Sequence, residues 1–449
     1  MRGGYGILYG AITYADFGAD LQTGFQANPT FTSPNAFNPA FNLGSGVPAY
    51  PLPPNLDPSQ VNFQGNPANA YVDPSYGRPA MVQNWSFDVQ QQLTTDLIVD
   101  LAYVGQHSTR LRSNVDPINV LDPKYFSLGS LLGQTITSPA AAAAGIAPPF
   151  PNFPSTQTVG QALLQYPQFF TLNTDCCLEN LGQSTYNAFE ASLRRRFRNG
   201  LNLMAAYTWS KTLTNADSIL PFFAQTTGLG TVQNPYNQKA EKALSQQDIP
   251  QNFVLSYIYE LPVGKGKKFL NRGGVVNAVL GGWSISGIQT YHSGQPTNFC
   301  CATAIPAWGH NIRFNQVPGQ PLFSPVFLSG NYDPVTDPIF NAAAFSDPNA
   351  PARIAAGGAY QLGNMAREIG SARSFFYYGE DFNLLKRTYI TEHTDFLLQV
   401  TFLNAFNRHI FDAHNSVDLN PLDTSFGILN TNNTLQGPRR IQLQLKFEF

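Results

Sequence analysis

The residues best suited to covalent chemistry are four cysteines, which stand as two adjacent pairs, Cys176-Cys177 and Cys300-Cys301, in separate Pro/Gly/Asn-rich stretches. Bonding neighbours strains the backbone, so the two connectivities that join the stretches are favoured among the three that four cysteines allow. Reduced thiols and a metal site stay open as alternatives, although zinc sites use Cys-x-x-Cys spacing. We therefore predict disulfides between these pairs, in an oxidising compartment.

The other candidates for chemistry are weaker. Gly264–Lys268 (Gly-Lys-Gly-Lys-Lys) lacks the spacing and final Ser or Thr of a phosphate loop, and is predicted to be a basic turn. The chain has no nucleophile elbow, catalytic carboxylate pair or nucleotide fingerprint, so catalysis has no support and no cofactor or metal is predicted. Six histidines are scattered without a zincin-type motif, and solvated loop positions fit them best: residues His107, His292, His310, His393, His409 and His414.

The C-terminal nine residues predict the kind of element that positions everything else. Apolar and polar residues alternate there without a break, and a period of two places alternate side chains on opposite faces of a strand. Membrane barrels use such two-faced strands throughout, because one face meets lipid and the other a wet lumen. A terminal strand that ends on Phe also resembles the signal read by the outer-membrane assembly machinery. The apolar residues of this predicted assembly signal are Ile441, Leu443, Leu445, Phe447 and Phe449.

The same alternation recurs in pairs along the chain. Asn199-Gly200 joins two alternating runs, which is a strong hairpin signal. Together the runs predict ten strands, at about residues 5–13, 85–93, 97–103, 189–197, 201–209, 253–261, 283–291, 382–389, 396–402 and 441–449. Long Pro/Gly/Asn-rich stretches lie between the hairpins, at roughly 15–82, 106–184, 212–250, 292–372 and 407–438. If the last strand ends in the periplasm, every short turn is periplasmic and every long stretch extracellular, as in outer-membrane barrels.

The composition agrees with strands joined by irregular loops. Charged residues make up 12% of the 449 residues, against about 25% in ordinary soluble domains. Aromatic residues reach 13%, and the net charge of −2 gives no reason to expect nucleic acid as a partner. No apolar run approaches the roughly 18 residues of a spanning helix. The nearest candidate, Ala140 to Ile146, is predicted to be loop because Pro148 and Pro149 follow it.

Charged and aromatic residues fit the two faces of such strands. Arg194 and Arg196 are expected to face the lumen with Glu190, whereas Arg195 falls on the lipid side near the interface, where its long stem reaches the headgroups. Trp85, Trp209 and Trp283 are expected at strand ends, where interfacial aromatic girdles lie. Aromatic residues are also simply good strand formers, which is the alternative explanation.

Four strings resemble one known family. Thr208–Thr212, Asp248–Phe253, Glu260–Gly266 and Phe402–Asn407 stand in matching order. They are similar to the barrel half of Oar-like TonB-dependent receptors, outer-membrane proteins with a carboxypeptidase-regulatory-like β-sandwich. The resemblance implies an all-β, antiparallel transmembrane barrel of roughly 22 strands. Residues 1–449 would form its C-terminal part, about ten strands with long extracellular loops.

The resemblance also implies parts that this chain lacks. The family's signal peptide, β-sandwich, TonB box and plug have no counterpart here, and Met1–Tyr5 begins no secretory signal. We therefore expect a longer protein, and coupling to the TonB system through a missing N-terminal part. Expressed alone, an open sheet with two unpaired edges is expected to aggregate rather than insert as a stable monomer.

The leading hypothesis is that the chain is the C-terminal barrel segment of a TonB-dependent receptor, which moves an unknown extracellular ligand across the outer membrane. Its partners would be outer-membrane lipid, the barrel-assembly machinery and the TonB system. A passive porin-like barrel and a secreted β-rich adhesin or carbohydrate-binding protein are the alternatives, and the latter predicts even repeats with short loops. Loop aromatics are candidate ligand contacts, although packing between loops explains them equally well: Tyr71, Tyr76, Phe222, Phe223 and Trp308.

Overall fold

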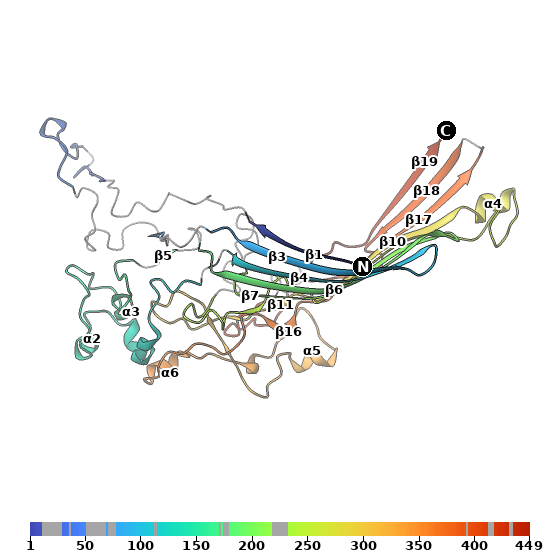
Figure 1. Cartoon of the computed structure of the whole chain (residues 1–449). Coiled ribbons are helices and arrows are strands. Elements are labelled where there is room, and N and C mark those ends of the chain that lie inside the picture. Colours follow the sequence, from blue (N-terminus) through green and yellow to red (C-terminus); the bar gives the residue numbers. More distant parts are fainter. Residues whose placement is uncertain are drawn as a thin grey trace.

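The computed structural model has one large sheet and a cluster of folded loops at one end of it (Figure 1). The structure describes residues 1–10, 29–35, 37–50, 69–70, 78–111, 113, 115–169, 172–173, 179–217, 232–391, 394–411, 417–430 and 434–449. Among these residues, no helix is long and apolar enough to cross a membrane.

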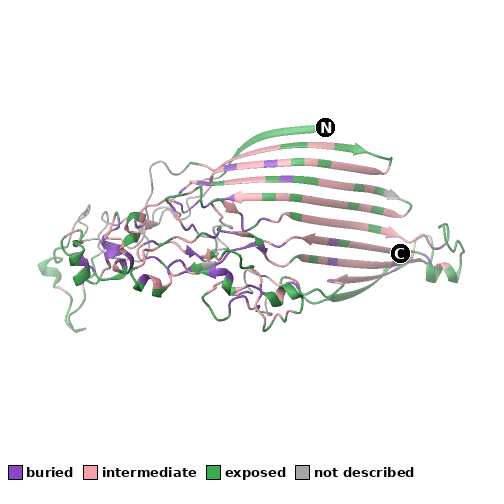
Figure 2. Cartoon of the chain, turned by 90° about the horizontal axis from the view of Figure 1, so that it is seen from below, coloured by how far each residue is buried: buried purple, intermediate pink, exposed green. Residues whose placement is uncertain are grey.

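Ten strands lie side by side in the order of the sequence, each antiparallel to the next (Figure 2). A short eleventh strand, β8 (Ala243–Leu244), extends the sheet beside β7. The all-β, antiparallel fold predicted from the alternation is therefore confirmed, and so is the number of long strands. These are β1 (Arg2–Tyr9), β3 (Met81–Gln92), β4 (Leu97–Leu111), β6 (Gly182–Arg198), β7 (Leu201–Thr214), β9 (Gln251–Glu260), β10 (Trp283–His292), β17 (Tyr377–Tyr389), β18 (Asp395–Leu403) and β19 (Arg440–Glu448).

Several predicted boundaries were wrong by a few residues. The first strand begins at Arg2 rather than Tyr5 and ends at Tyr9, and Thr13 lies outside the described residues. Three strands continue into stretches that lack the alternation: β4 runs to Leu111, β6 begins at Gly182 and β7 runs to Thr214. In these added segments the backbone still forms hydrogen bonds with the neighbouring strand. Backbone pairing therefore extends the three strands beyond the residues that form an apolar face.

The two ends of the sheet differ in what joins the strands. Both termini and the short connections after β3, β6 and β17 lie at one end, because Arg2 pairs with Asp88 and Glu448 pairs with Asp395. The long stretches after β4, β7, β10 and β18 all gather at the opposite end (Figures 1 and 2). We call the described residues of these four stretches the cap, and the other end the short-turn end.

The cap is folded rather than structureless, which corrects the prediction of irregular loops. Ala140–Ile146, predicted to be loop, overlaps the helix α2 (Pro139–Ala143), whose N-terminus is capped by the side chain of Ser138 and whose Ala141 is fully buried. Short elements recur along the cap: η2 (Pro123–Gly133), α3 (Val159–Ala162), α5 (Pro325–Ser329), η4 (Ala342–Ala344), α6 (Pro351–Ala355), and the paired strands β11 (Pro296–Thr297) with β16 (Ile369–Arg373), β12 (Cys300–Ala302) with β13 (Ile312–Arg313), and β14 (Asn315–Gln316) with β15 (Phe345–Ser346). Outside the cap lie η1 (Leu43–Ser45), β2 (Asn69–Ala70) and, at the short-turn end, α4 (Val275–Leu280). The strand β2 pairs in parallel with β5 (Leu172–Asn173) of the cap.

The hydrophobic core lies in the cap and not under the sheet. Phe299 packs against Phe340, Phe345 and Phe426, with ring centroids 4.6–6.1 Å apart, in the edge-on and tilted arrangements that aromatic pairs prefer. Three segments distant in sequence therefore share one core: 121–164, 299–372 and 417–429. The strands of the large sheet, by contrast, carry large apolar side chains that the rest of the chain leaves exposed. Such a surface is expected where a partner or a membrane covers it.

One glycine shows how closely the strand side chains fit. The indole of Trp85 on β3 lies across Gly105 on β4, its register partner, so that a Cβ at Gly105 would come within 2.2 Å of the indole. The three tryptophans were predicted to lie at strand ends. Trp85 and Trp209 instead lie in the interior of β3 and β7, and of the three only Trp283 lies at a strand end, as the first residue of β10.

We predict that Gly105→Ala destabilises the folded protein by about 1–3 kcal/mol, because the indole of Trp85 must move to admit the methyl group. Thermal unfolding of the longer protein expected above, purified from membranes in detergent and followed by heat-modifiable gel migration, measures the change. Gly6→Ala on β1 is the matched control, since a Cβ there meets no atom within 4 Å. Equal unfolding temperatures for the two variants would contradict the proposed contact.

Candidate functional site

The continuous register of the sheet sorts every strand residue onto one of two faces. The face of Ile441, Leu443 and Leu445 continues through β18, β17, β10, β9, β7, β6, β4 and β3 to Tyr5 and Ile7 on β1. Rows of aromatic side chains cross this face towards the cap end. They are Phe87, Tyr103, Phe189 and Trp209 in one row, and Tyr207, Phe253, Tyr291 and Tyr378 in the next.

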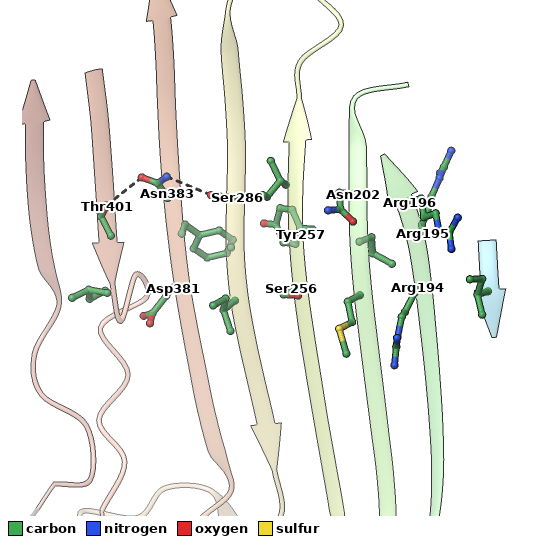
Figure 3. Close-up of a pocket in the computed structure, with 18 residues that line it drawn as sticks. Arg194, Arg195, Arg196, Asn202, Ser256, Tyr257, Ser286, Asp381, Asn383 and Thr401 are labelled. Carbon is green, nitrogen blue, oxygen red and sulfur yellow. Dashed lines mark hydrogen bonds between the residues drawn. The ribbon is translucent and has the colours of Figure 1, made fainter. Parts of the chain in front are cut away.

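The opposite face carries a row of polar side chains across the last strands. Ser286, Asn383, Thr401 and Gln442 occupy matching register positions on β10, β17, β18 and β19. Asn383 Nδ2 donates to Ser286 Oγ at 3.4 Å, and Thr401 Oγ1 donates to Asn383 Oδ1 at 3.2 Å (Figure 3). Hydroxyl and amide groups therefore line this face at a depth where the other face is apolar. We call this row the polar row.

A shallow hollow of about 770 Å³ lies against the polar face, between β4 and β18. The polar row forms one side of it, and Arg194, Arg196 and Asn202 lie on the other (Figure 3). Arg194 and Arg196 are exposed on this face, whereas Arg195 points to the apolar face, where its Nε lies 3.3 Å from Asp96 Oδ2. The predicted sorting of the three arginines is confirmed. The described lining of the hollow offers hydrogen-bonding groups, the positive charges of Arg194 and Arg196 and the carboxylate of Asp381, together with apolar side chains such as Ile258 and Ile288.

A buried ion pair joins two stretches of the cap, the one after β7 and the one after β10. Glu241 is fully buried and pairs with Arg313 of β13. Gln233 bridges the two segments, because its Oε1 accepts the amide hydrogen of Arg313 at 2.7 Å and its carbonyl accepts Trp308 Nε1 at 2.8 Å. Trp308 is 1% exposed, so it belongs to the cap core and is not a surface for a ligand. Sequence reasoning missed this network because nothing in local spacing relates residue 241 to residue 313.

A second buried cluster lies where β16 meets the end of β7. Arg367 pairs with Asp217 at 2.9 Å and donates to the carbonyl of Thr214 at 2.6 Å. The adjacent Glu368 accepts a hydrogen bond from Asn298 Nδ2 at 3.1 Å. Burial is the largest influence on Glu368 and raises the pKa of its carboxyl to about 7. Burial also lowers the pKa of His310 to about 4.

The structure partly tests the cysteine and histidine predictions. Cys301 takes part in a disulfide, while Cys176, Cys177 and the side chain of Cys300 lie outside the described residues, so cross-loop pairing stays a prediction. His107 and His292 lie in strands rather than in solvated loops. Among the described residues, no group of three His, Cys, Asp or Glu could hold a metal ion. Also outside the described residues are His393, His414, Tyr71, Tyr76, Phe222 and Phe223.

A family model described as outer membrane beta barrel domain matches residues 1–442. The chain belongs to this family. The protein accordingly resides in the outer membrane, and its apolar sheet face is the one that meets lipid. The polar face is then the lumen wall, and the hollow between Arg194 and Thr401 lies on that wall.

No curated protein matches the chain. Among solved structures it is similar to the outer membrane transporter YddB from Escherichia coli, with 8% identity, 86% of this chain and 35% of that chain covered, and a TM-score of 0.39. It is also similar to FpvA of P. aeruginosa bound to heterologous pyoverdines (11%, 83% and 28%, TM-score 0.33) and to the E. coli ferric-catecholate import receptor Fiu (10%, 87% and 31%, TM-score 0.34). The chain spans about a third of the length of these structures.

The raised pKa of Glu368 predicts a pH-dependent cap. The folded cap binds a proton that the unfolded chain releases near 4.5, so this stabilisation is complete below that pH and is lost as pH rises through about 7. The shift corresponds to on the order of 3 kcal/mol. The protection factors of amides in residues 292–372, which are exchange rates corrected for the intrinsic pH dependence of exchange, are therefore expected to fall between about pH 5 and pH 8.

The variant Glu368→Gln stays neutral throughout and is expected to remove most of this pH dependence, because the amide cannot ionise. Asp423→Asn, an exposed carboxyl in the same cap, is the matched control and should leave the profile unchanged. A Glu368→Gln profile that still follows the wild type would show that another group controls it.

Proposed function

We propose that the chain is the C-terminal part of the barrel of an Oar-like TonB-dependent receptor, which moves an extracellular ligand across the outer membrane. The four motifs within Thr208–Asn407 support the family subtype. The polar row and the two arginines Arg194 and Arg196 across the hollow carry the transport proposal, because half-buried hydroxyl and amide groups and exposed guanidinium groups on a lumen wall can exchange hydrogen bonds with a passing polar ligand.

The sheet edges support the view that this is part of a larger barrel. Within the described residues, β1 and β19 are the two ends of the strand order and have no outer neighbour. Lipid cannot satisfy their backbone groups, so further strands must do so, up to the roughly 22 of this receptor class. We place the signal peptide, β-sandwich, plug and TonB contact in a part N-terminal to residue 1.

In this proposal the cap faces the exterior and captures the ligand, and the energised plug opens the path along the lumen wall. The last strand is the assembly signal, because its apolar residues are at least half exposed and present one continuous face to the assembly machinery: Ile441, Leu443, Leu445, Phe447 and Phe449.

The alternatives make different predictions about energy. A passive porin conducts small solutes without an energised membrane, whereas a receptor closed by a plug does not. A secreted adhesin has no reason to expose aromatic rows and an apolar face across the ten long strands. The membrane assignment therefore leaves the porin as the alternative to test.

We predict that the protein takes up its ligand only when the membrane is energised. Solutes removed from the medium by the wild-type host are compared with those removed by a deletion strain, with and without a protonophore. A solute whose loss requires both the gene and the proton gradient identifies the ligand. Removal that continues after the gradient collapses, or rapid swelling of vesicles containing the purified protein in a small sugar, would favour the porin.

The lumen wall supplies the site-directed form of this test. Ser286→Trp and Asn383→Trp place indoles in the polar row and should reduce uptake to the level of the deletion strain. Ile285→Trp, one residue away on the lipid face, is the matched control and should retain uptake. Equal loss in lumen and lipid-face variants would contradict a path along this wall.

A further inference from the structure

The connection between β9 and β10, residues 261–282, differs from the other connections at the short-turn end. β6 and β7 are joined through Asn199 and Gly200 alone, and β3 and β4 through residues 93–96. Residues 261–282 instead form a long turn with its own helix, α4, which projects beyond the ends of the strands (Figure 1). We call residues 261–282 the helical turn.

Contacts within the helical turn hold its shape. Asn277 Oδ1 in α4 accepts the amide hydrogen of Lys265 at 2.7 Å, and the amide of Phe269 donates to the carbonyl of Pro262 at 2.9 Å. Gly264 lets these segments approach, because a Cβ there would lie 2.7 Å from Asn277 Oδ1 at a φ of +114°. The turn is therefore a built element rather than a loose connection.

Two side chains fix α4 to the lipid-facing side of the sheet. Trp283 and Lys386 are register partners, and both belong to the face of Leu398 and Leu445. Trp283 Nε1 donates to the carbonyl of Val279 at 3.0 Å, and Lys386 Nζ donates to the carbonyl of Gly281. The hydrogen bonds of Trp283 and Lys386 therefore hold α4 outside the lumen, at the level where the apolar face of the sheet ends.

The helical turn exposes an unusual amount of apolar surface for its size. Val275 is 80% exposed and Val279 58% exposed, and α4 has no buried residue. In water such a cluster has no compensating contact, whereas at a bilayer boundary it is continuous with the lipid-facing strands. The other large apolar residues of the turn, each 40–52% exposed, are Phe269, Leu270, Val276 and Leu280.

The helical turn that carries this apolar cluster is also positively charged. Lys265, Lys267, Lys268 and Arg272 all lie in the helical turn, and residues 261–282 contain no acidic residue. Lys267 pairs with Glu260 at the end of β9, and Lys268 lies over the ring of Phe269, 5.4 Å from its centroid. A short element that combines exposed apolar residues with several cations is typical of segments that lie in the headgroup region of a membrane.

We propose that the helical turn is an interfacial anchor that inserts its apolar side chains among the phospholipids of the leaflet at the short-turn end. Val275, Val279 and Leu280 enter the boundary between headgroups and acyl chains, and the cations bind headgroup phosphates. Phospholipid is the occupant because the site continues the lipid-facing surface and is positively charged. The periplasmic identity of that leaflet rests on the orientation proposed above, whereas the insertion itself does not.

The test measures the depth of α4 in vesicles. The protein, purified from outer membranes, carries Val279→Cys labelled with a bimane fluorophore and is reconstituted with phospholipid bearing a headgroup nitroxide. Leu328→Cys on α5 in the cap, 61% exposed, is the matched control. We expect strong quenching at residue 279 and little at residue 328. Equal quenching at both sites overturns the proposal. Val275→Cys repeats the measurement if Val279→Cys does not give a heat-modifiable barrel.

The charges supply an independent arm. Exchanging zwitterionic for anionic phospholipid should deepen the quenching at residue 279, and Lys265→Gln with Arg272→Gln should weaken this response. Each cation near an anionic surface is expected to change local partitioning about fivefold. A response to anionic lipid as large in the double variant as in the parent protein contradicts headgroup binding by these two cations. Because neither arm involves uptake, failure of the transport proposal would leave these results unaffected.

Discussion

Backbone hydrogen bonding in lipid is the constraint on which the rest of the structure depends. The hydrocarbon region contains no water, so each strand must find both of its neighbours and hold them in one register. A slip by a single residue would exchange the faces and place Asn383 or Arg194 in lipid. The unbroken pairing from β1 to β19 is therefore what turns a simple alternation of residue types into a lipid face and a lumen wall.

That constraint also separates the molecule into two regimes of stability. The strands contribute little to a hydrophobic core, because their apolar side chains contact membrane lipid rather than other protein side chains. The cap stands in water and must bury apolar surface to stay folded, which it does around Phe299, Phe340 and Trp308. It can also hold the buried pairs Arg313–Glu241 and Arg367–Asp217, where removal of one partner would leave an isolated charge.

The same division decides what could be predicted from the sequence. The hairpins, the two faces and the sorting of Arg194 from Arg195 follow from a period of two, which is a local property. The cap was predicted to be irregular because its contacts join residues that are distant in sequence. Gln233, for example, accepts hydrogen bonds from the amides of Arg313 and Gly363, and such contacts leave no periodic pattern in the sequence. Trp308 had two equal interpretations, and only the packing of Phe126 and Tyr236 on its ring decides between them. The polar row depends on the register between strands that are distant in sequence, such as β10 and β17, and the local alternation of residue types does not determine that register.

The two edge strands of the sheet, β1 and β19, carry charged residues that form ion pairs within the sheet. On β1, Arg2 lies between Asp88 and Asp100, at 3.2 Å and 3.9 Å. Near β19, Arg387 bridges Asp395 and Glu448, and Lys446 pairs with Glu448. These exposed pairs add little stability individually, but they give several edge charges a partner within the sheet. An incoming strand meets backbone donors and acceptors and, on one side, an apolar face. Specificity at closure must then come from register and from the fit of lipid-facing side chains such as Tyr5 and Leu443.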